Sequence, residues 1–204
     1  MTSHKQTLGE DIAFMRALAE EGRSRPLIGR SILLGSGVLY GTASLLVWAA
    51  STYGFMNSGT VPLIWLAALI GSIVQLAFAR STWALSGESA ANRASGLAWA
   101  GASWAIFVVV FSMILVAART GDLLVMATLP SIALAFYGSA WFVAAALTRS
   151  GWLFGVAFGS FLMALVSAWF VAEGAIVYLI YAISLYALAA APGFVLMRRA
   201  RRPA

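Results

Sequence analysis

The side chains that usually carry out chemistry are scarce in this sequence. Its 204 residues include one histidine, His4, and one lysine, Lys5, both ahead of the first long apolar segment, and no cysteine. An intramembrane bis-histidine haem, an HExxH zinc site, a serine–histidine dyad and a retinal Schiff base each need one of these groups inside the membrane. The lack of cysteine excludes disulfides and thiolate metal sites. We therefore expect no catalytic residue, no cofactor and no metal site.

One match to a known motif lacks its partners. Glu20, Glu21 and Arg25 have the EExxxR spacing of the first motif of the CAAX-type intramembrane proteases. In that family the glutamates work with histidines on later membrane helices, and His4 is the only histidine in this chain. The motif also precedes the first apolar segment. We interpret the match as coincidence.

Ionisable residues are absent from the centres of the long apolar segments. Such a residue at membrane depth usually serves an ion or proton path, because its burial in lipid is costly. Arg119, Asp122 and Glu173 fall near segment ends, and so coupled pumping has no obvious group to titrate. A lipid-active enzyme would need ionisable groups converging on one face, and the only such set is Arg80, Glu88, Arg93 and Arg149. The sequence favours a protein that is not an enzyme.

A few neutral polar side chains do fall at membrane depth. Gln75 is an amide that needs hydrogen-bond partners in hydrocarbon, and it either joins helices or lines a path for a solute. Tyr178 and Tyr181 share one face of the last segment. With Tyr137 and Ser131 of the fourth segment they line a cavity for an uncharged solute or lipid, or else pack as core. These five residues are the candidate cavity or helix-contact set.

The elements that must position these residues are membrane helices. The chain is 62% hydrophobic and 10% charged, with a mean hydropathy of +0.90, whereas soluble proteins are about 45 to 50% apolar and about 25% charged. A spanning helix takes about 20 apolar residues, and six such runs are present: Pro26–Ala50, Val61–Ala79, Gly96–Ala118, Leu123–Leu147, Trp152–Val171 and Ala175–Met197. Short links make neighbouring helices antiparallel. The sequence predicts an all-α, polytopic membrane protein with six transmembrane helices in one antiparallel bundle.

The basic residues predict the orientation of these helices. Arg119 alone falls on one side of the predicted topology, while the other twelve of the thirteen Lys and Arg residues fall on the opposite set of connections and ends. By the positive-inside rule both termini are cytoplasmic. The preference for Arg over Lys, with frequent Ala and Gly, is typical of a GC-rich bacterial genome and favours a bacterial inner membrane. The basic residues form no aromatic-interleaved groove, so we expect no nucleic-acid partner.

The first 25 residues form a separate cytoplasmic segment. Thr7 and Glu10 have the spacing of a capping box, and apolar residues then recur at helical spacing over residues 8–21. This amphipathic helix is largely acidic, which is the wrong sign for adsorption to anionic lipid. It either lies in the membrane interface or docks under the helix bundle, or else it presents residues 8–21 to a protein partner. The predicted organisation is this segment at 1–25, a transmembrane domain at 26–197 and a basic cytoplasmic tail at 198–204.

Small residues mark the candidate helix contacts. Gly37 and Gly41 in the first segment, and Gly155 and Gly159 in the fifth, are GxxxG pairs, which let two helix backbones approach closely in lipid. They serve packing within the chain or the seam of a homo-oligomer. Membrane lipids are the remaining expected partners.

Prolines and tryptophans add two further expectations. Pro130 and Pro192 lie inside the fourth and sixth segments, where each should kink its helix and free a backbone carbonyl. Prolines of this kind are either an ordinary feature of membrane helices or form part of a substrate site. Tryptophans near segment ends, including Trp65 and Trp99, fit an aromatic belt at the membrane interface, whereas Trp141 lies deeper.

Two functions from different classes remain compatible with these observations. The first is a non-catalytic accessory, scaffold or sensor subunit that acts through helix packing and its cytoplasmic amphipathic helix. The alternative is a channel or facilitator for a small uncharged solute or lipid. A dry core of Gly, Ala, Leu and Phe would favour the first, and a polar, water-lined path would favour the second.

Overall fold

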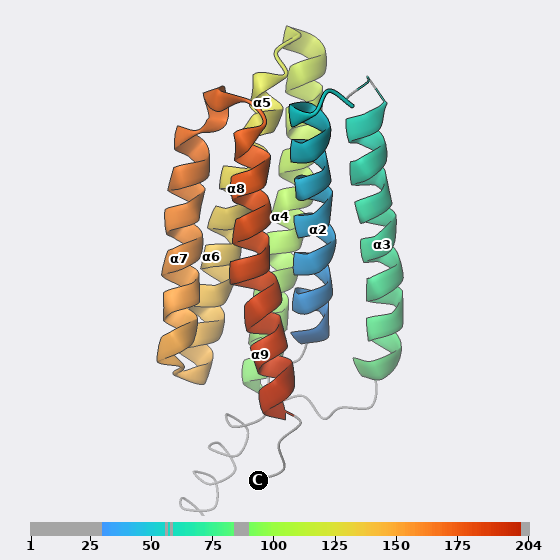
Figure 1. Ribbon diagram of the computed structural model, residues 1–204. Helices are drawn as coiled ribbons and strands as arrows, with labels where there is room; N and C mark the ends of the chain where they lie inside the picture. Colours follow the sequence, from blue (N-terminus) through green and yellow to red (C-terminus); the bar gives the residue numbers. More distant parts are fainter. Residues whose placement is uncertain (1–29, 56, 58, 84–89, 201–204) are drawn as a thin grey trace, which may run out of the picture.

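A computed structural model describes residues 30–55, 57, 59–83 and 90–200, and the regular structure of these residues is helical (Figure 1). The helices are α2 (Arg30–Thr52), α3 (Thr60–Trp83), α4 (Ala90–Thr120), α5 (Leu124–Ala127), α6 (Leu129–Thr148), α7 (Gly151–Trp169), α8 (Ile176–Leu185) and α9 (Ala191–Ala200). A 3-10 turn, Val171–Glu173, precedes α8, and a π-helical turn, Tyr186–Ala190, joins α8 to α9. The predicted amphipathic helix at residues 8–21 lies outside the described residues.

Six stretches of these helices are long and apolar enough to cross a membrane. They are Ser31–Thr52, Thr60–Phe78, Arg93–Thr120, Leu124–Thr148, Gly151–Trp169 and Ile176–Arg199. Each overlaps one of the six segments predicted from the sequence. The chain is therefore an all-helical, multi-pass membrane protein.

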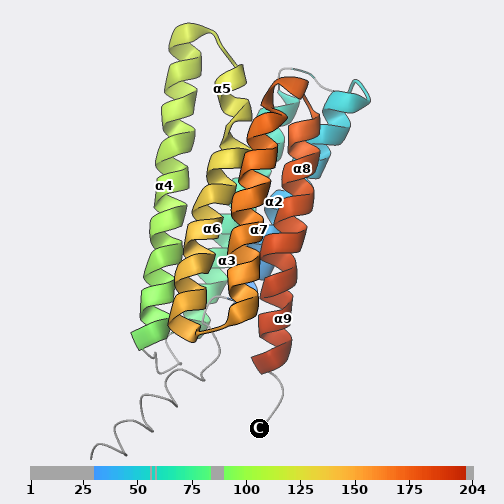
Figure 2. The same cartoon turned by 90° about the vertical axis from the view of Figure 1, so that its left-hand side faces the viewer.

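Four of the spans form the inside of the helical bundle, and two lie outside it. α2 packs against α8 and α9, and α7 packs along α6. α3 rests chiefly on α2 (Figure 1), and α4 rests chiefly on α6 (Figure 2). These two outer helices are also the least buried of the six spans.

Small side chains allow the inner helices to approach closely. The buried residues of α7 are Leu153, Ala157, Ser160, Ala164 and Ser167. They are spaced alternately by four and three residues, which is the seam of a left-handed helix pair. Four of the five are Ala or Ser, so the backbones come close enough for dispersion contacts to hold helices together in lipid.

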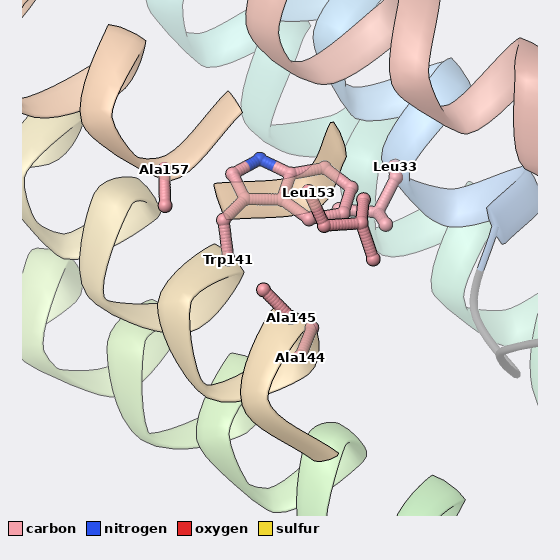
Figure 3. Close-up of a cluster of buried hydrophobic side chains, with 6 residues drawn as sticks. All are labelled: Leu33, Trp141, Ala144, Ala145, Leu153 and Ala157. Carbon is pink, nitrogen blue, oxygen red and sulfur yellow. The ribbon is translucent and has the colours of Figure 1, made fainter. Parts of the chain in front are cut away.

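A single tryptophan fills the centre of the first core cluster. The cluster consists of Leu33, Trp141, Ala144, Ala145, Leu153 and Ala157, from α2, α6 and α7 (Figure 3). The ring of Trp141 is 0% exposed and reaches from α6 toward α2. Because its neighbours on α6 are alanines, the large ring finds room beside its own helix.

The indole of Trp141 also donates a hydrogen bond to a backbone carbonyl of the last span that lacks its usual helical donor. Pro192 has no backbone N–H, so it cannot donate to the carbonyl of Leu188, four residues earlier. Trp141 Nε1 donates to this carbonyl oxygen at 2.8 Å. The helix is π-helical over Tyr186–Ala190, just ahead of the proline. The freed carbonyl expected from Pro192 is thus bonded by a side chain of α6.

Pro130 behaves differently from Pro192. The fourth span breaks at Thr128 into the short helix α5 and the long helix α6. Pro130 lies in the first turn of α6, where a missing N–H costs little because those amides have no helical acceptor. Pro130 therefore begins a helix here and does not interrupt one.

We predict that the Trp141 bond and Pro192 are energetically coupled. Trp141→Phe should lower the free energy of unfolding by about 1–2 kcal/mol, because the Leu188 carbonyl loses its donor. In a Pro192→Ala background the new backbone N–H can bond that carbonyl, so the same substitution should cost less. The measurement is a double-mutant cycle of unfolding in mild detergent.

Trp169→Phe is the matched control for this cycle. Trp169 is 83% exposed on α7, so its replacement should be insensitive to the residue at position 192. An equal cost of Trp141→Phe in both backgrounds would contradict the coupling.

Candidate functional site

Gln75 joins the outer helix α3 to α2. Its Nε2 atom donates to the carbonyl oxygens of Ser31 at 3.1 Å and Ile32 at 3.0 Å. Its Oε1 atom accepts from the hydroxyl of Ser36 at 3.4 Å. The amide also lies against Gly35, where any Cβ would collide with it. The side chain is thus occupied by interhelical bonds in this structure.

A second polar contact joins the same two helices one turn away. Ser72 Oγ of α3 is hydrogen-bonded to the Tyr40 hydroxyl of α2 at 2.7 Å and to the Ala68 carbonyl of its own helix at 2.9 Å. The ring of Tyr40 stacks on Trp65 of α3, with centroids 6.5 Å apart. α3 is therefore held to α2 by an amide, a hydroxyl pair and an aromatic stack.

Three tyrosines from three helices meet beside these contacts. Tyr181 of α8 is 6% exposed and belongs to the second core cluster, with Tyr40 of α2 and Tyr137 of α6 packed against that cluster. We call Tyr40, Tyr137 and Tyr181 the tyrosine cluster.

The hydroxyls of this cluster differ in their hydrogen bonding. Tyr40 is bonded to Ser72. Across the described residues, neither Tyr137 nor Tyr181 has a hydrogen-bond partner for its hydroxyl. Neither oxygen is sealed from the surroundings, since Ser167 Oγ is the one fully buried, unpartnered side-chain polar atom found in the described part of the chain. One open donor thus lies on the buried Tyr181, and the other lies on the half-buried Tyr137.

Two tryptophans from the outer helices complete the surroundings. Trp99 of α4 lies 5.5 Å from Tyr137 and 5.1 Å from Trp141, measured between ring centroids. Trp65 of α3 stacks on Tyr40. Both tryptophans are half-buried, and each packs against a tyrosine of the bundle. The aromatic belt expected from the sequence stays a prediction.

The structure brings together only part of the predicted cavity set. Tyr137 and Tyr181 share the second core cluster, whereas Ser131 and Tyr178 are half-buried and lie outside it. The contribution of Tyr40 was not anticipated. Its signal in the sequence is a tyrosine in the middle of the first apolar segment.

The four candidate packing glycines have different surroundings. A Cβ on Gly37 would lie 2.5 Å from the backbone nitrogen of Ala190, and a Cβ on Gly41 would lie 3.2 Å from the ring of Tyr186. A Cβ on Gly159 would lie 3.1 Å from Leu188. One on Gly155 would meet nothing within 4 Å, so a role for Gly155 in a homo-oligomer seam stays a prediction.

The tyrosine cluster can donate hydrogen bonds beside aromatic faces, and it carries no acidic or basic side chain. In the described ranges, no group of three or more His, Cys, Asp or Glu residues could hold a metal ion. Comparison of the chain with known protein families, characterised proteins and solved structures finds no match.

We predict that methyl groups added at Gly37 and Gly155 have different effects. Gly37→Ala should destabilise the protein by about 1–3 kcal/mol, because the new methyl overlaps the backbone of the π-helical turn. Gly155→Ala should leave the stability of the monomer unchanged or slightly raised. Unfolding in detergent measures both. Equal effects would show that the α2 contact is looser than described.

Proposed function

We propose that this chain is a non-catalytic integral membrane protein that acts as an accessory, scaffold or sensor subunit through helix packing. Its inner core supports this proposal because it is largely apolar. The first core cluster is built from alanines, leucines and one tryptophan. The hydroxyls of the buried Ser44, Ser160 and Ser184 bond carbonyls of their own helices, at 2.7 to 2.9 Å. These serines need no water, and so they do not require a hydrated path.

The observation that carries the proposal is the outward face of α4. Its exposed residues Leu97, Trp104, Val108, Phe111 and Leu115 lie on the four-and-three spacing of a left-handed helix pair. Trp104 also makes an edge contact with Phe107, which in turn packs on Phe111. A ladder of large rings of this kind fits the side of another membrane helix, where packing drives association in lipid.

The proposal places the protein in a bacterial inner membrane, with antiparallel spans and both termini in the cytoplasm. Trp152, in the first turn of α7, lies under the guanidinium of Arg199 at the end of α9, and Cζ is 5.1 Å from the ring centroid. This contact supports a common membrane side for the α6–α7 turn and the C-terminus. Arg149 lies in the same turn, and clustered arginines favour the cytoplasmic side.

The tyrosine cluster favours the alternative function in one respect. Open hydroxyls at Tyr137 and Tyr181 are suited to an uncharged ligand, as a facilitator or a sensor would require. A sensor subunit combines this feature with the apolar core and the outward face of α4.

The predicted orientation can be tested by labelling single cysteines introduced into the chain. Because the chain has no cysteine of its own, all labelling of the protein reports the introduced residue. In spheroplasts, a membrane-impermeant maleimide should label Glu173→Cys at once, because this position is on the periplasmic side. Ser150→Cys should react only after the membrane is permeabilised. Labelling of Ser150→Cys in sealed spheroplasts would show that the orientation is the reverse of the one proposed.

The partner role is tested by photo-crosslinking in the native membrane. A photoreactive phenylalanine is introduced at Trp104 or Phe111 on α4, and at Phe158 or Leu165 on the exposed face of α7 as matched controls. We expect the α4 positions to join the chain to one membrane protein in stoichiometric yield, and the α7 positions to capture lipid only. Each experiment is repeated with a chain that lacks residues 1–25.

The outcomes separate the contributions of the two segments. Loss of the adduct on truncation would assign the N-terminal segment, including residues 8–21, to the same contact. Adducts only between copies of this chain would replace the accessory role with a homo-oligomer. Lipid alone at every position would refute the accessory role.

A further inference from the structure

Within the described residues, the hydroxyls of Tyr137 and Tyr181 have no hydrogen-bond partner, which is also true of Ser131, Tyr178 and the fully buried Ser167. Tyr181 is the buried tyrosine of this group, and Tyr137 packs against its core cluster.

Most other polar groups inside the bundle are paired. The hydroxyl of Tyr186 is paired with Thr42 at 2.7 Å, and the indole of Trp141 is paired with the Leu188 carbonyl. Buried serines such as Ser44 and Ser160 bond their own helices. Most buried polar groups in proteins are paired in this way, and leaving one unpaired costs about 1–3 kcal/mol. The open pair at Tyr137 and Tyr181 therefore needs an explanation.

The surroundings of these hydroxyls define what they can bind. Only 6% of the Tyr181 side chain and backbone is exposed, yet its hydroxyl oxygen is not sealed. Trp99 packs against Tyr137, and Trp65 stacks on Tyr40. Phenol hydroxyls donate to carbonyl oxygens, and aromatic rings prefer to pack against flat rings.

Charge restricts the ligand further. The described ionisable residues of these helices lie near span ends and are exposed, as are Arg93, Arg119 and Glu173. A charged head group would therefore lack a counter-ion at the depth of the cluster, and its transfer into the bilayer interior would be costly. The ligand must be uncharged and soluble in the membrane.

We infer that the tyrosine cluster binds one uncharged, membrane-soluble molecule with a planar head group that carries a carbonyl oxygen. The hydroxyls of Tyr137 and Tyr181 donate to the head group, and Trp65 and Trp99 contribute aromatic walls. A quinone ring has this chemistry. The inference concerns binding alone, and it goes beyond the partner role because it requires no second protein.

The test uses 2-methyl-1,4-naphthoquinone as the probe and the purified full-length chain in mild detergent. Since the chain has no cysteine, the quinone has no thiol to alkylate, and equilibrium dialysis reports reversible binding. We expect saturable binding of one probe per chain. 2-Methylnaphthalene, which has the ring system without the carbonyls, should bind at least about tenfold more weakly, because it offers no acceptor to the two hydroxyls.

Variants identify the residues involved. Tyr137→Phe and Tyr181→Phe keep the rings and should each raise the dissociation constant of the quinone by about 5- to 30-fold. Tyr186→Phe is the matched control, because its hydroxyl bonds Thr42 outside the cluster, and it should leave the affinity unchanged. Thermal unfolding of each variant confirms that it is folded.

Three results would overturn the inference. These are no saturable quinone binding, equal binding of the quinone and the hydrocarbon, and unchanged affinity in a folded Tyr137→Phe, Tyr181→Phe double variant. The last two would show that the hydroxyls contact only water or lipid. Failure here leaves the α4 crosslinks unaffected, so the ligand and partner proposals can fail separately.

Discussion

The hydrogen bond from Trp141 to the Leu188 carbonyl satisfies the strictest physical demand on this fold. Within a bilayer no water is available to a free backbone carbonyl, so a proline inside a span needs a donor from another helix. Pro192 creates that need, and α6 meets it with a fully buried indole. The same ring fills the core between α2, α6 and α7. One side chain thus fixes the last span and the inner helices together.

The π-helical turn beside this hydrogen bond also contacts α2. Tyr181 lies just before the π-helical turn, and Ala190 lies at its end, where its backbone packs against Gly37 of α2. A larger residue at position 37 would push the turn away from α2. The turn, the glycine and the indole therefore act as one unit. The outer helix α3 is then attached to α2 by the polar contacts of Gln75 and Ser72.

Sequence reasoning predicted the elements better than the faces they bury. Six spans, the freed carbonyl at Pro192 and the need of Gln75 for partners all follow from residue type and run length. The inward packing of Trp65 and Trp99 and the open surroundings of Gly155 do not. In a soluble helix the apolar face marks the core. In a membrane span both the lipid face and the core face are apolar, so periodicity carries no information on which side is buried.

The tyrosine cluster is a site that only packing creates. Tyr40, Tyr137 and Tyr181 come from three helices far apart in sequence. The two outer helices that supply Trp65 and Trp99 to its surroundings are also the helices whose remaining surface faces outward. A ligand at the cluster and a partner on α4 would therefore act on the same helix. By thermodynamic linkage, a ligand that strengthens the partner's binding must itself bind more tightly when the partner is present. If the chain is an accessory subunit as proposed, packing against α4 would carry this coupling, and no catalytic group would be needed to report the state of the membrane to the partner.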